Sequence, residues 1–113
     1  MKFEYKEIAL QNQIRYLLAI RQLNQTKHLI KSVDIARELD YSRASVHKVL
    51  NCLLDTNYIK KEYYSSVSLT NLGKKAAEKY NEKYKFVKNK LKTIVDKDDN
   101  YNIGICELIV NMK

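Results

Sequence analysis

The spacing of apolar residues predicts a mainly helical chain. Apolar positions recur every three or four residues, which is the period of one buried face of an α-helix. Polar residues interrupt this pattern at 24–31 and 96–100. Ser32, Ser42 and Thr70 each stand where a hydroxyl oxygen can cap the first turn of a helix. The pattern predicts helices over residues 5–23, 32–39, 42–55, 71–95 and 102–112.

The stretch between the third and fourth predicted helices is β-prone. Asn57 is suited to end the helix over 42–55, because asparagine tolerates a left-handed backbone. Residues 58–63 and 67–69 are rich in Tyr, Ile, Val and Leu, which favour strands. The connection between them lacks the Asn-Gly pair typical of the tightest hairpin turns. We predict a two-stranded hairpin with a polar tip at residues 64–66.

The order of these elements is that of a winged helix-turn-helix. Helices 32–39 and 42–55 are joined by a tight turn at Asp40 and Tyr41, and the hairpin and a lysine-rich helix follow. We therefore expect a mainly α fold, with a three-helix core and a β-hairpin wing, followed by a long helix and a C-terminal dimerisation helix. Residues 1–73 would form the DNA-binding part and residues 74–113 a helical dimerisation segment of the same compact domain. The stripe that helix 42–55 buries is predicted as Val46, Val49, Leu50, Leu53 and Leu54.

Positive charge coincides with this motif. The net charge is +8, and residues 42–92 alone hold twelve basic and four acidic residues, whereas residues 1–41 sum to +2 and residues 93–113 to −2. A basic surface raises affinity for polyanions through counterion release, without sequence preference. A lysine-rich composition without proline also fits an AT-rich genome, so it is the overlap with the motif that favours nucleic acid as the partner.

Composition excludes several other classes. A chain of 113 residues that is 45% hydrophobic and 30% charged fits one globular domain. No apolar run approaches the roughly 20 residues of a membrane helix, and the N-terminus lacks the apolar core of a secretory signal. Cys52 and Cys106 form no CxxC pair, so we expect reduced thiols and a cytoplasmic protein. His28 and His47 lie on separate elements, and no phosphate loop or paired carboxylates occur, so we expect no enzyme activity and no cofactor.

The polar side of helix 42–55 is the predicted DNA-reading surface. Short residues near a helix N-terminus let the backbone approach a phosphate, which the free N–H groups favour. Arg43 and Lys48 can donate to guanine O6 and N7, Ala44 can touch a thymine methyl group, and Ser45 is suited to a phosphate. Each also has a plainer interpretation as a solvated side chain, and Ser42 as a helix cap; for Ser42 we expect both roles. The predicted contact residues of this helix are Ser42, Arg43, Ala44, Ser45, His47 and Lys48.

The hairpin supplies a second set of candidates for the DNA backbone or minor groove. Successive strand residues face opposite ways, so Lys60 and Lys61 cannot both point at DNA. Tyr63 has an alternative role as a core residue. The predicted wing contacts are Lys61, Tyr64, Ser65 and Ser66.

The segments VDIAREL, SRASV and LTNLGKKAA resemble the DNA-binding half of the iron- and manganese-dependent repressors, the diphtheria toxin repressor-like family. The later segments EKYKFVKNKLKTIV and NIGICELIVNM are similar to that family's fourth helix and to the fifth helix of its dimerisation region. The resemblance covers about residues 8–112 and implies a homodimer that binds a palindromic operator in double-stranded DNA and represses transcription. Similar motifs occur in other winged-helix regulators, including the MarR-like group.

The resemblance also implies metal-ligand positions, and most of them are altered here. Only Cys106 keeps a side chain that readily binds a metal, and a lysine ammonium would repel a divalent cation. We therefore expect no metal site, with Cys106 as the one remaining candidate ligand and a small buried residue as its plainer role. The altered positions are Ala9 or Leu10, Asn12, Tyr84, Lys88, Asn102, Ile109 and Val110.

The leading hypothesis is a sequence-specific DNA-binding transcriptional regulator, a homodimeric repressor that needs no metal corepressor. Alternatives are a metal-dependent repressor with a non-standard site, a MarR-like regulator, and a winged-helix protein-interaction module. The dimer prediction depends on apolar surface on the first helix and residues 103–112; the alternative is that these stripes pack on each other within one subunit. The chain stops at Lys113, before the further helix and SH3-like domain of longer family members, so we expect an input other than metal.

Overall fold

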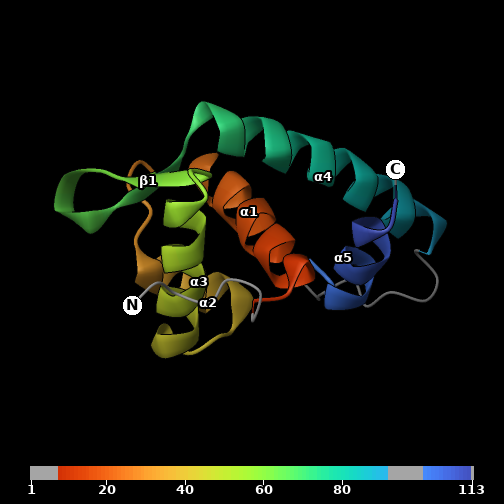
Figure 1. Cartoon of the computed structure of the whole chain (residues 1–113), viewed down its shortest axis with the longest axis horizontal. Helices are drawn as coiled ribbons and strands as arrows, with labels where there is room; N and C mark the ends of the chain where they lie inside the picture. The colour runs from red at the N-terminus through yellow and green to blue at the C-terminus, as the bar shows by residue number, and fades with distance from the viewer. Residues whose placement is uncertain (1–7, 92–100, 113) are drawn as a thin grey trace.

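A computed structural model describes residues 8–91 and 101–112 of the chain. This part is mostly helical with a two-stranded antiparallel hairpin, which confirms the predicted winged helix-turn-helix (Figure 1). The predicted helix over 71–95 ends at Lys90, and residues 5–7 and 92–100 lie outside the described residues. The elements are α1 (Leu10–Asn24), α2 (Ser32–Leu39), α3 (Arg43–Asp55), β1 (Ile59–Lys61), a 3-10 turn η2 (Tyr63–Ser65), β2 (Val67–Leu69), α4 (Asn71–Lys90) and α5 (Ile103–Val110).

The helix-turn-helix unit is formed by local hydrogen bonds around α2 and α3. The predicted cap at Ser32 is wrong by one residue: Lys31 stands at the N-cap position, and the Asp34 carboxylate accepts a hydrogen bond from the Lys31 N–H at 2.8 Å. Asp40 ends α2 in the left-handed region, with φ 58°. Ser42 caps α3 as predicted, because its Oγ accepts from the Ser45 N–H at 3.2 Å.

The hairpin follows directly from α3. Asn57 makes the turn in the left-handed region as expected, with φ 65°. β1 pairs antiparallel with β2, so that Ile59 faces Leu69 and Lys61 faces Val67. Ile30, which lies in the segment predicted to be a polar loop, forms an additional bridge with Val67 and is buried. Ile30 therefore ties the otherwise exposed loop between α1 and α2 to the hairpin and the core.

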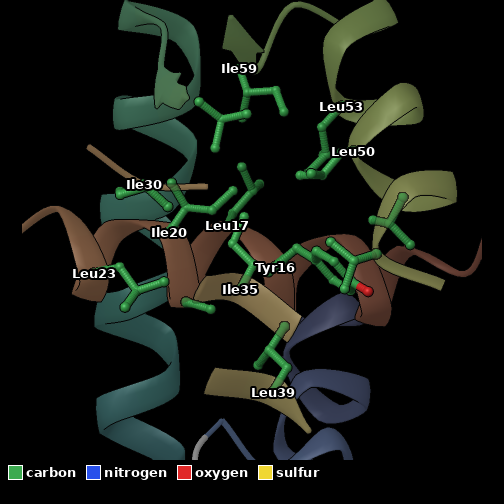
Figure 2. Close-up of a cluster of buried hydrophobic side chains, with 14 of the residues drawn as sticks. Tyr16, Leu17, Ile20, Leu23, Ile30, Ile35, Leu39, Leu50, Leu53 and Ile59 are labelled. Carbon is green, nitrogen blue, oxygen red and sulfur yellow. The ribbon is translucent and has the colours of Figure 1, made fainter. Parts of the chain in front are cut away.

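One hydrophobic cluster holds the winged helix together around α1. Figure 2 shows Leu17 and Ile20 of this helix beside Ile35 of α2, Leu53 of α3 and Ile59 of β1. All of these side chains are almost completely buried. Full burial of such a side chain stabilises a fold by about 1.5–3 kcal/mol. Because residues of α2, α3 and β1 all lie in one cluster with those of α1, α1 is the element on which the other elements pack. The predicted stripe of α3 is buried, with Leu54 only partly so, and Cys52 joins it.

A second cluster lies between α1, α4 and α5. Its buried members include Ile14 and Leu18 of α1, Tyr84 of α4, and Ile105 and Ile109 of α5. Asn102 caps α5, since its Oδ1 accepts from the Ile105 N–H at 3.2 Å. The apolar faces of α1 and α5 thus pack on each other within one subunit. This packing is the alternative that the sequence left open. The apolar face of α1 is covered within the subunit, so it no longer supports a dimer.

Candidate nucleic-acid interface

Helix α3 separates its apolar and polar residues onto opposite faces. Val46, Val49, Leu50 and Leu53 are buried, because they face α1 and the hairpin. Apart from the buried Cys52 and the half-buried Leu54, the other residues of the helix are solvent-exposed. The exposed set contains every predicted contact of this helix and two more residues, and consists of Ser42, Arg43, Ala44, Ser45, His47, Lys48, Asn51 and Asp55.

The N-terminus of α3 is available to an anion. Ser42 Oγ donates to Ser45 Oγ at 3.0 Å while it accepts from the Ser45 backbone N–H, so the two hydroxyls form one exposed cluster. The first turn of α3 contains no acidic residue, and Arg43 begins the helix. Unpaired N–H groups and the helix dipole favour a phosphate at such an end.

A hollow of about 300 Å³ lies between α3 and the wing. His47 and Asn51 of α3 line one side, and Lys61 and Ser65 of the hairpin line the other. Lys60 faces the opposite way: it pairs with Ser68 in the ladder, and its Nζ lies 3.5 Å from Glu62 Oε1. Lys61 is therefore the hairpin lysine on the α3 side. Strand alternation is the reason that only one of the two can be there.

Two polar residues that line the hollow were missing from the predicted contact set. Asn51 lies one helical turn after His47, so the i, i+4 rule could have identified it from sequence. Ser32 also lines the hollow, although the sequence suggested only a capping role for it. Its position depends on how α2 packs beside the hairpin, and no local signal carries that information.

The wing tip differs from the prediction at two residues. Tyr63 is 79% exposed, so the alternative of a core residue is wrong. Ser66 was predicted to contact DNA, but it is only 2% exposed and cannot present its side chain to a ligand. The reason is that its N–H donates to Tyr63 O and its carbonyl accepts from the Glu62 N–H, which holds Ser66 inside the closing turn. Tyr64 and Ser65 remain exposed at the tip.

Positive charge is less concentrated on α3 than the sequence suggested. Of the twelve basic residues in 42–92, Arg43 and Lys48 lie on α3 and Lys60 and Lys61 lie in β1. Seven others lie on α4, which runs from the wing toward α5, away from α3 (Figure 1). The exposed face of α3 is thus modestly basic, and much of the net charge belongs to a separate helix.

The positions that the family resemblance assigns to metal ligands do not suit a cation. Tyr84, Cys106 and Ile109 are buried together in the second hydrophobic cluster. The Tyr84 hydroxyl accepts a hydrogen bond from the Asn102 N–H at 2.6 Å, and Lys88 Nζ lies 6.0 Å from the centre of the Tyr84 ring. Among residues 8–91 and 101–112, no three His, Cys, Asp or Glu side chains gather into a possible metal site.

The space beside this cluster is also cationic. A hollow of about 420 Å³ between α1 and α4 is lined by Arg21, Lys85 and Lys88 together with Tyr84 and Tyr101. Burial, with a smaller effect from Glu38, raises the pKa of Tyr101 to about 12, so its phenol stays neutral. Ala9, Asn12 and Val110, which stand at further ligand positions, lie half-buried, and Leu10 is exposed. A divalent cation would meet repulsion here and few donors.

Comparison with known proteins gives matches in structure only. No protein-family model matches the chain, and no curated protein sequence matches it. MepR, a transcription regulator of the Staphylococcus aureus multidrug efflux pump MepA, is 19% identical over 92% of this chain and 78% of its own, with a TM-score of 0.51. A MepR mutant from a multidrug-resistant S. aureus clinical isolate is 18% identical over 100% of this chain and 87% of its own, with a TM-score of 0.57. Another S. aureus MepR mutant, bound to an oligodeoxyribonucleotide, is 14% identical over 96% of this chain and 84% of its own, with a TM-score of 0.55.

MepR is a winged-helix regulator of the MarR family. The comparisons therefore support the winged-helix part of the sequence resemblance and do not support the diphtheria toxin repressor-like family. These neighbours are transcription regulators and not enzymes, in line with the expectation from sequence. In the described part of the chain, no helix is both long and apolar enough to cross a membrane. At these identities the likeness establishes the fold, and the chain has the winged helix-turn-helix architecture of MepR.

Proposed function

We propose that the protein is a sequence-selective, double-stranded DNA-binding regulator of transcription, and specifically a repressor. The observation that carries the proposal is the continuous polar surface formed by the exposed face of α3, the hollow beside it and the wing. One side of the hollow comes from a helix that fits a major groove and the other from a hairpin of the size that follows a backbone or minor groove. A structural neighbour was solved bound to an oligodeoxyribonucleotide, which supports DNA as the partner.

The roles within the surface follow from side-chain chemistry. Arg43 and Lys48 would donate to guanine O6 and N7, and each good contact is worth roughly 1–3 kcal/mol of discrimination. Ala44 would meet a thymine methyl group, and His47 would face the duplex beside the hollow. Ser42 and Ser45 would bind a phosphate at the helix N-terminus, and Lys61, Tyr64 and Ser65 would contact DNA from the wing.

We further propose a homodimer that uses residues 74–113, with residues 1–73 as the DNA-binding part of the same domain. The surface that supports this lies on α4 and α5, because α1 and α5 cover each other. Phe86 is 58% exposed and Leu108 is 52% exposed, and Ile103 is exposed as well. A two-fold dimer of such units would read two half-sites whose centres lie about one helical turn of DNA, or a multiple of it, apart.

A MarR-like regulator that needs no metal fits this chain better than a metal-dependent repressor does. Apart from the Cys106 thiol and the amides of Asn12 and Asn102, the side chains at the family-implied ligand positions are apolar, phenolic or cationic, and this set does not suit iron or manganese. A chelator is therefore expected to leave DNA binding unchanged. The same argument disfavours a metal-dependent repressor with a non-standard site, since the described residues offer no alternative cluster.

The test is selection of bound duplexes from random and genomic fragments, followed by titration at two salt concentrations with and without manganese, iron or EDTA. The double variant Arg43→Ala/Lys48→Ala should lose the selected sequence. Lys75→Ala/Lys79→Ala, on the exposed side of α4, removes the same number of positive charges and should still bind the selected sequence. Equal loss in both variants would mean that the charge acts without sequence reading.

Other outcomes point to the alternative functions. Weak, wholly salt-sensitive binding with no selected duplex would contradict the proposal and favour a winged-helix protein-interaction module. Selection that requires metal would contradict the proposed independence from a corepressor. Sedimentation of the free protein and of its complex gives the stoichiometry, and one protomer per selected site would contradict the homodimer.

A further inference from the structure

The wing tip has an unusual backbone for its sequence. Ser66 N donates to Tyr63 O at 2.9 Å, which closes a turn whose central residues are Tyr64 and Ser65. Both have positive φ, 55° and 59°. That is the pattern of a type I′ hairpin turn, in which Asn-Gly is the favoured pair. A bulky residue in the left-handed region is uncommon and is disfavoured by roughly 1–2 kcal/mol.

The hairpin also contains one extra residue just before this turn. Lys61 pairs with Val67, so Glu62 and Tyr63 together face Ser66 across the hairpin. Such a bulge increases the local twist and changes the direction in which the tip points. The tip is therefore a shaped feature that projects aromatic side chains, at a cost that Asn-Gly would avoid.

The exposed chemistry of the tip is aromatic and not cationic. Tyr63 and Tyr64 are each 79% exposed, more than any other large hydrophobic side chain of the described residues. No Lys or Arg occurs between Glu62 and Ser66. The carboxylate of Glu62 is engaged by Lys60 Nζ at 3.5 Å and by the Ser68 hydroxyl at 2.8 Å, so the charges beside the tip largely offset each other. The tip itself therefore offers aromatic rings and hydroxyl groups to a ligand, and Lys61 is the wing lysine that lines the hollow.

The tip is continuous with the proposed reading surface. Ser65 lines the same hollow as His47 and Asn51 of α3. A duplex bound to α3 would therefore lie beside the tyrosines that directly precede Ser65. An aromatic group that reaches a minor groove can press between base pairs and partly unstack them. Pyrimidine–purine steps such as TA unstack most easily, whereas A-tracts are stiff.

We propose that the Tyr63–Tyr64 tip is an aromatic wedge that reads the deformability of the DNA beside the major-groove site, with Tyr64 pressing into a flexible pyrimidine–purine step. This inference rests on the proposed function and adds a second source of selectivity to it. α3 reads base edges, and the wing reads how readily the adjoining step opens.

The test uses the full chain and duplexes that share the selected α3 site but differ in the flanking minor groove. One duplex has a TA step there and the other an A-tract, and the adenine of the TA step is replaced by the fluorescent analogue 2-aminopurine. Tyr64→Asn/Ser65→Gly removes the ring and installs the pair that this turn favours, so the hairpin is retained. Ser65→Gly alone keeps the ring and loses the same Ser65 contact as the double variant, so it is the matched control, and the ratio of its affinities for the two duplexes is compared whatever its overall affinity. Lys61→Ala tests the neighbouring charge.

The wild type and Ser65→Gly should prefer the TA duplex roughly tenfold, as expected for one base–aromatic contact, and should raise the 2-aminopurine emission. Tyr64→Asn/Ser65→Gly should bind both duplexes equally, with an unchanged salt slope because no cation is lost. Lys61→Ala should lower the salt slope and keep the preference. A preference that survives in Tyr64→Asn/Ser65→Gly, or no emission change with the wild type, would overturn the wedge and leave the α3 site intact. A wild type that selects no duplex would overturn the proposed function and the wedge together.

Discussion

Arg15 Nε donates a hydrogen bond of 2.7 Å to the carbonyl oxygen of Tyr101, although 86 residues separate the two. The same guanidinium donates from Nη1 to the Tyr41 hydroxyl and lies 5.0 Å from the centre of the Tyr41 ring. Tyr41 directly precedes Ser42, the cap of α3, and stacks on Tyr16 of α1 at 5.9 Å. One side chain thus links the residue before the cap of α5 to the residue before the cap of α3.

Arg15→Ala should lower the free energy of unfolding by about 1–3 kcal/mol, because it leaves partly buried acceptors without their charged donor. Arg15→Lys should recover only part of this loss, since an ammonium lacks the planar fork that reaches both acceptors. Urea denaturation followed by circular dichroism measures both. Arg37→Ala is the control. The Arg37 side chain is 74% exposed and its ion pair with Asp34 is long, at 3.9 Å, so its loss should cost less than about 1 kcal/mol. Equal losses in Arg15→Ala and Arg37→Ala would contradict the link.

Gly73 permits the close approach of α4 to the end of α3. A Cβ atom at this position would lie 1.9 Å from the backbone oxygen of Tyr58, and backbone cannot move aside as a flexible side chain can. Gly73→Ala should therefore destabilise the protein by at least about 3 kcal/mol, the upper part of the range for overpacking. Thermal unfolding measures the difference.

Gly104→Ala is the matched control for Gly73. Its Cβ would lie 3.0 Å from Asn102 Oδ1, a tight contact with a side chain that can shift. The gain in helix propensity, roughly 1 kcal/mol, should offset this contact and leave the stability near that of the wild type. A Gly73→Ala protein as stable as Gly104→Ala would mean that α4 and Tyr58 are further apart than the structure places them.

Asp34 should make stability depend on pH in the acid range. Burial alone would raise the pKa of this carboxyl, but the Lys31 N–H and the nearby Lys27 and Arg37 hold it below its usual value. A depressed folded-state pKa contributes stability that is present above the unfolded value of about 3.9 and is lost as the pH falls through the folded value.

Asp34→Asn should be less stable than the wild type near neutral pH by about 1–2 kcal/mol, because the charged hydrogen bonds are lost. The gap should narrow as the pH falls below about 4, where the wild-type carboxyl also becomes neutral. Urea unfolding at several pH values between neutral and 3 measures this gap. A gap that stays constant across the range would contradict the role of the carboxylate charge.

Ser42 can be used to separate helix capping from DNA contact. Ser42→Ala should cost about 1 kcal/mol of stability, since the Ser45 N–H loses its acceptor. Ser42→Asp should keep the cap and the stability, because aspartate caps as well as serine. Its carboxylate would repel a phosphate at the N-terminus of α3, so Ser42→Asp should weaken DNA binding while Ser42→Ala weakens it less. Titration of both variants into the selected duplex decides this, and unchanged affinity in Ser42→Asp would leave Ser42 a cap only.

The amino-acid sequence by itself determined the order of the elements and the exposed face of α3. These features depend on local physics: the period of apolar residues, the hydroxyl caps Ser42 and Thr70, and the left-handed turn at Asn57. Arg43, Ala44, His47 and Lys48 could be placed on one surface because their spacing follows from helix geometry alone. For the same reason the alternation of a strand restricted the wing to one of its two lysines.

Only the tertiary structure decided which surfaces remain available. Ser66 is buried and Tyr63 is exposed because of how a bulged hairpin closes, and Asn-Gly, the local signal for such a turn, is absent. The approach of Ser32 and Ser65 to the recognition helix depends on contacts between segments distant in the chain. Likewise α5 covers α1 within one subunit, and α4 carries most of the basic residues of 42–92 away from α3. The pattern of apolar residues predicts that a face will be buried, but the packing of the whole chain determines which element buries it.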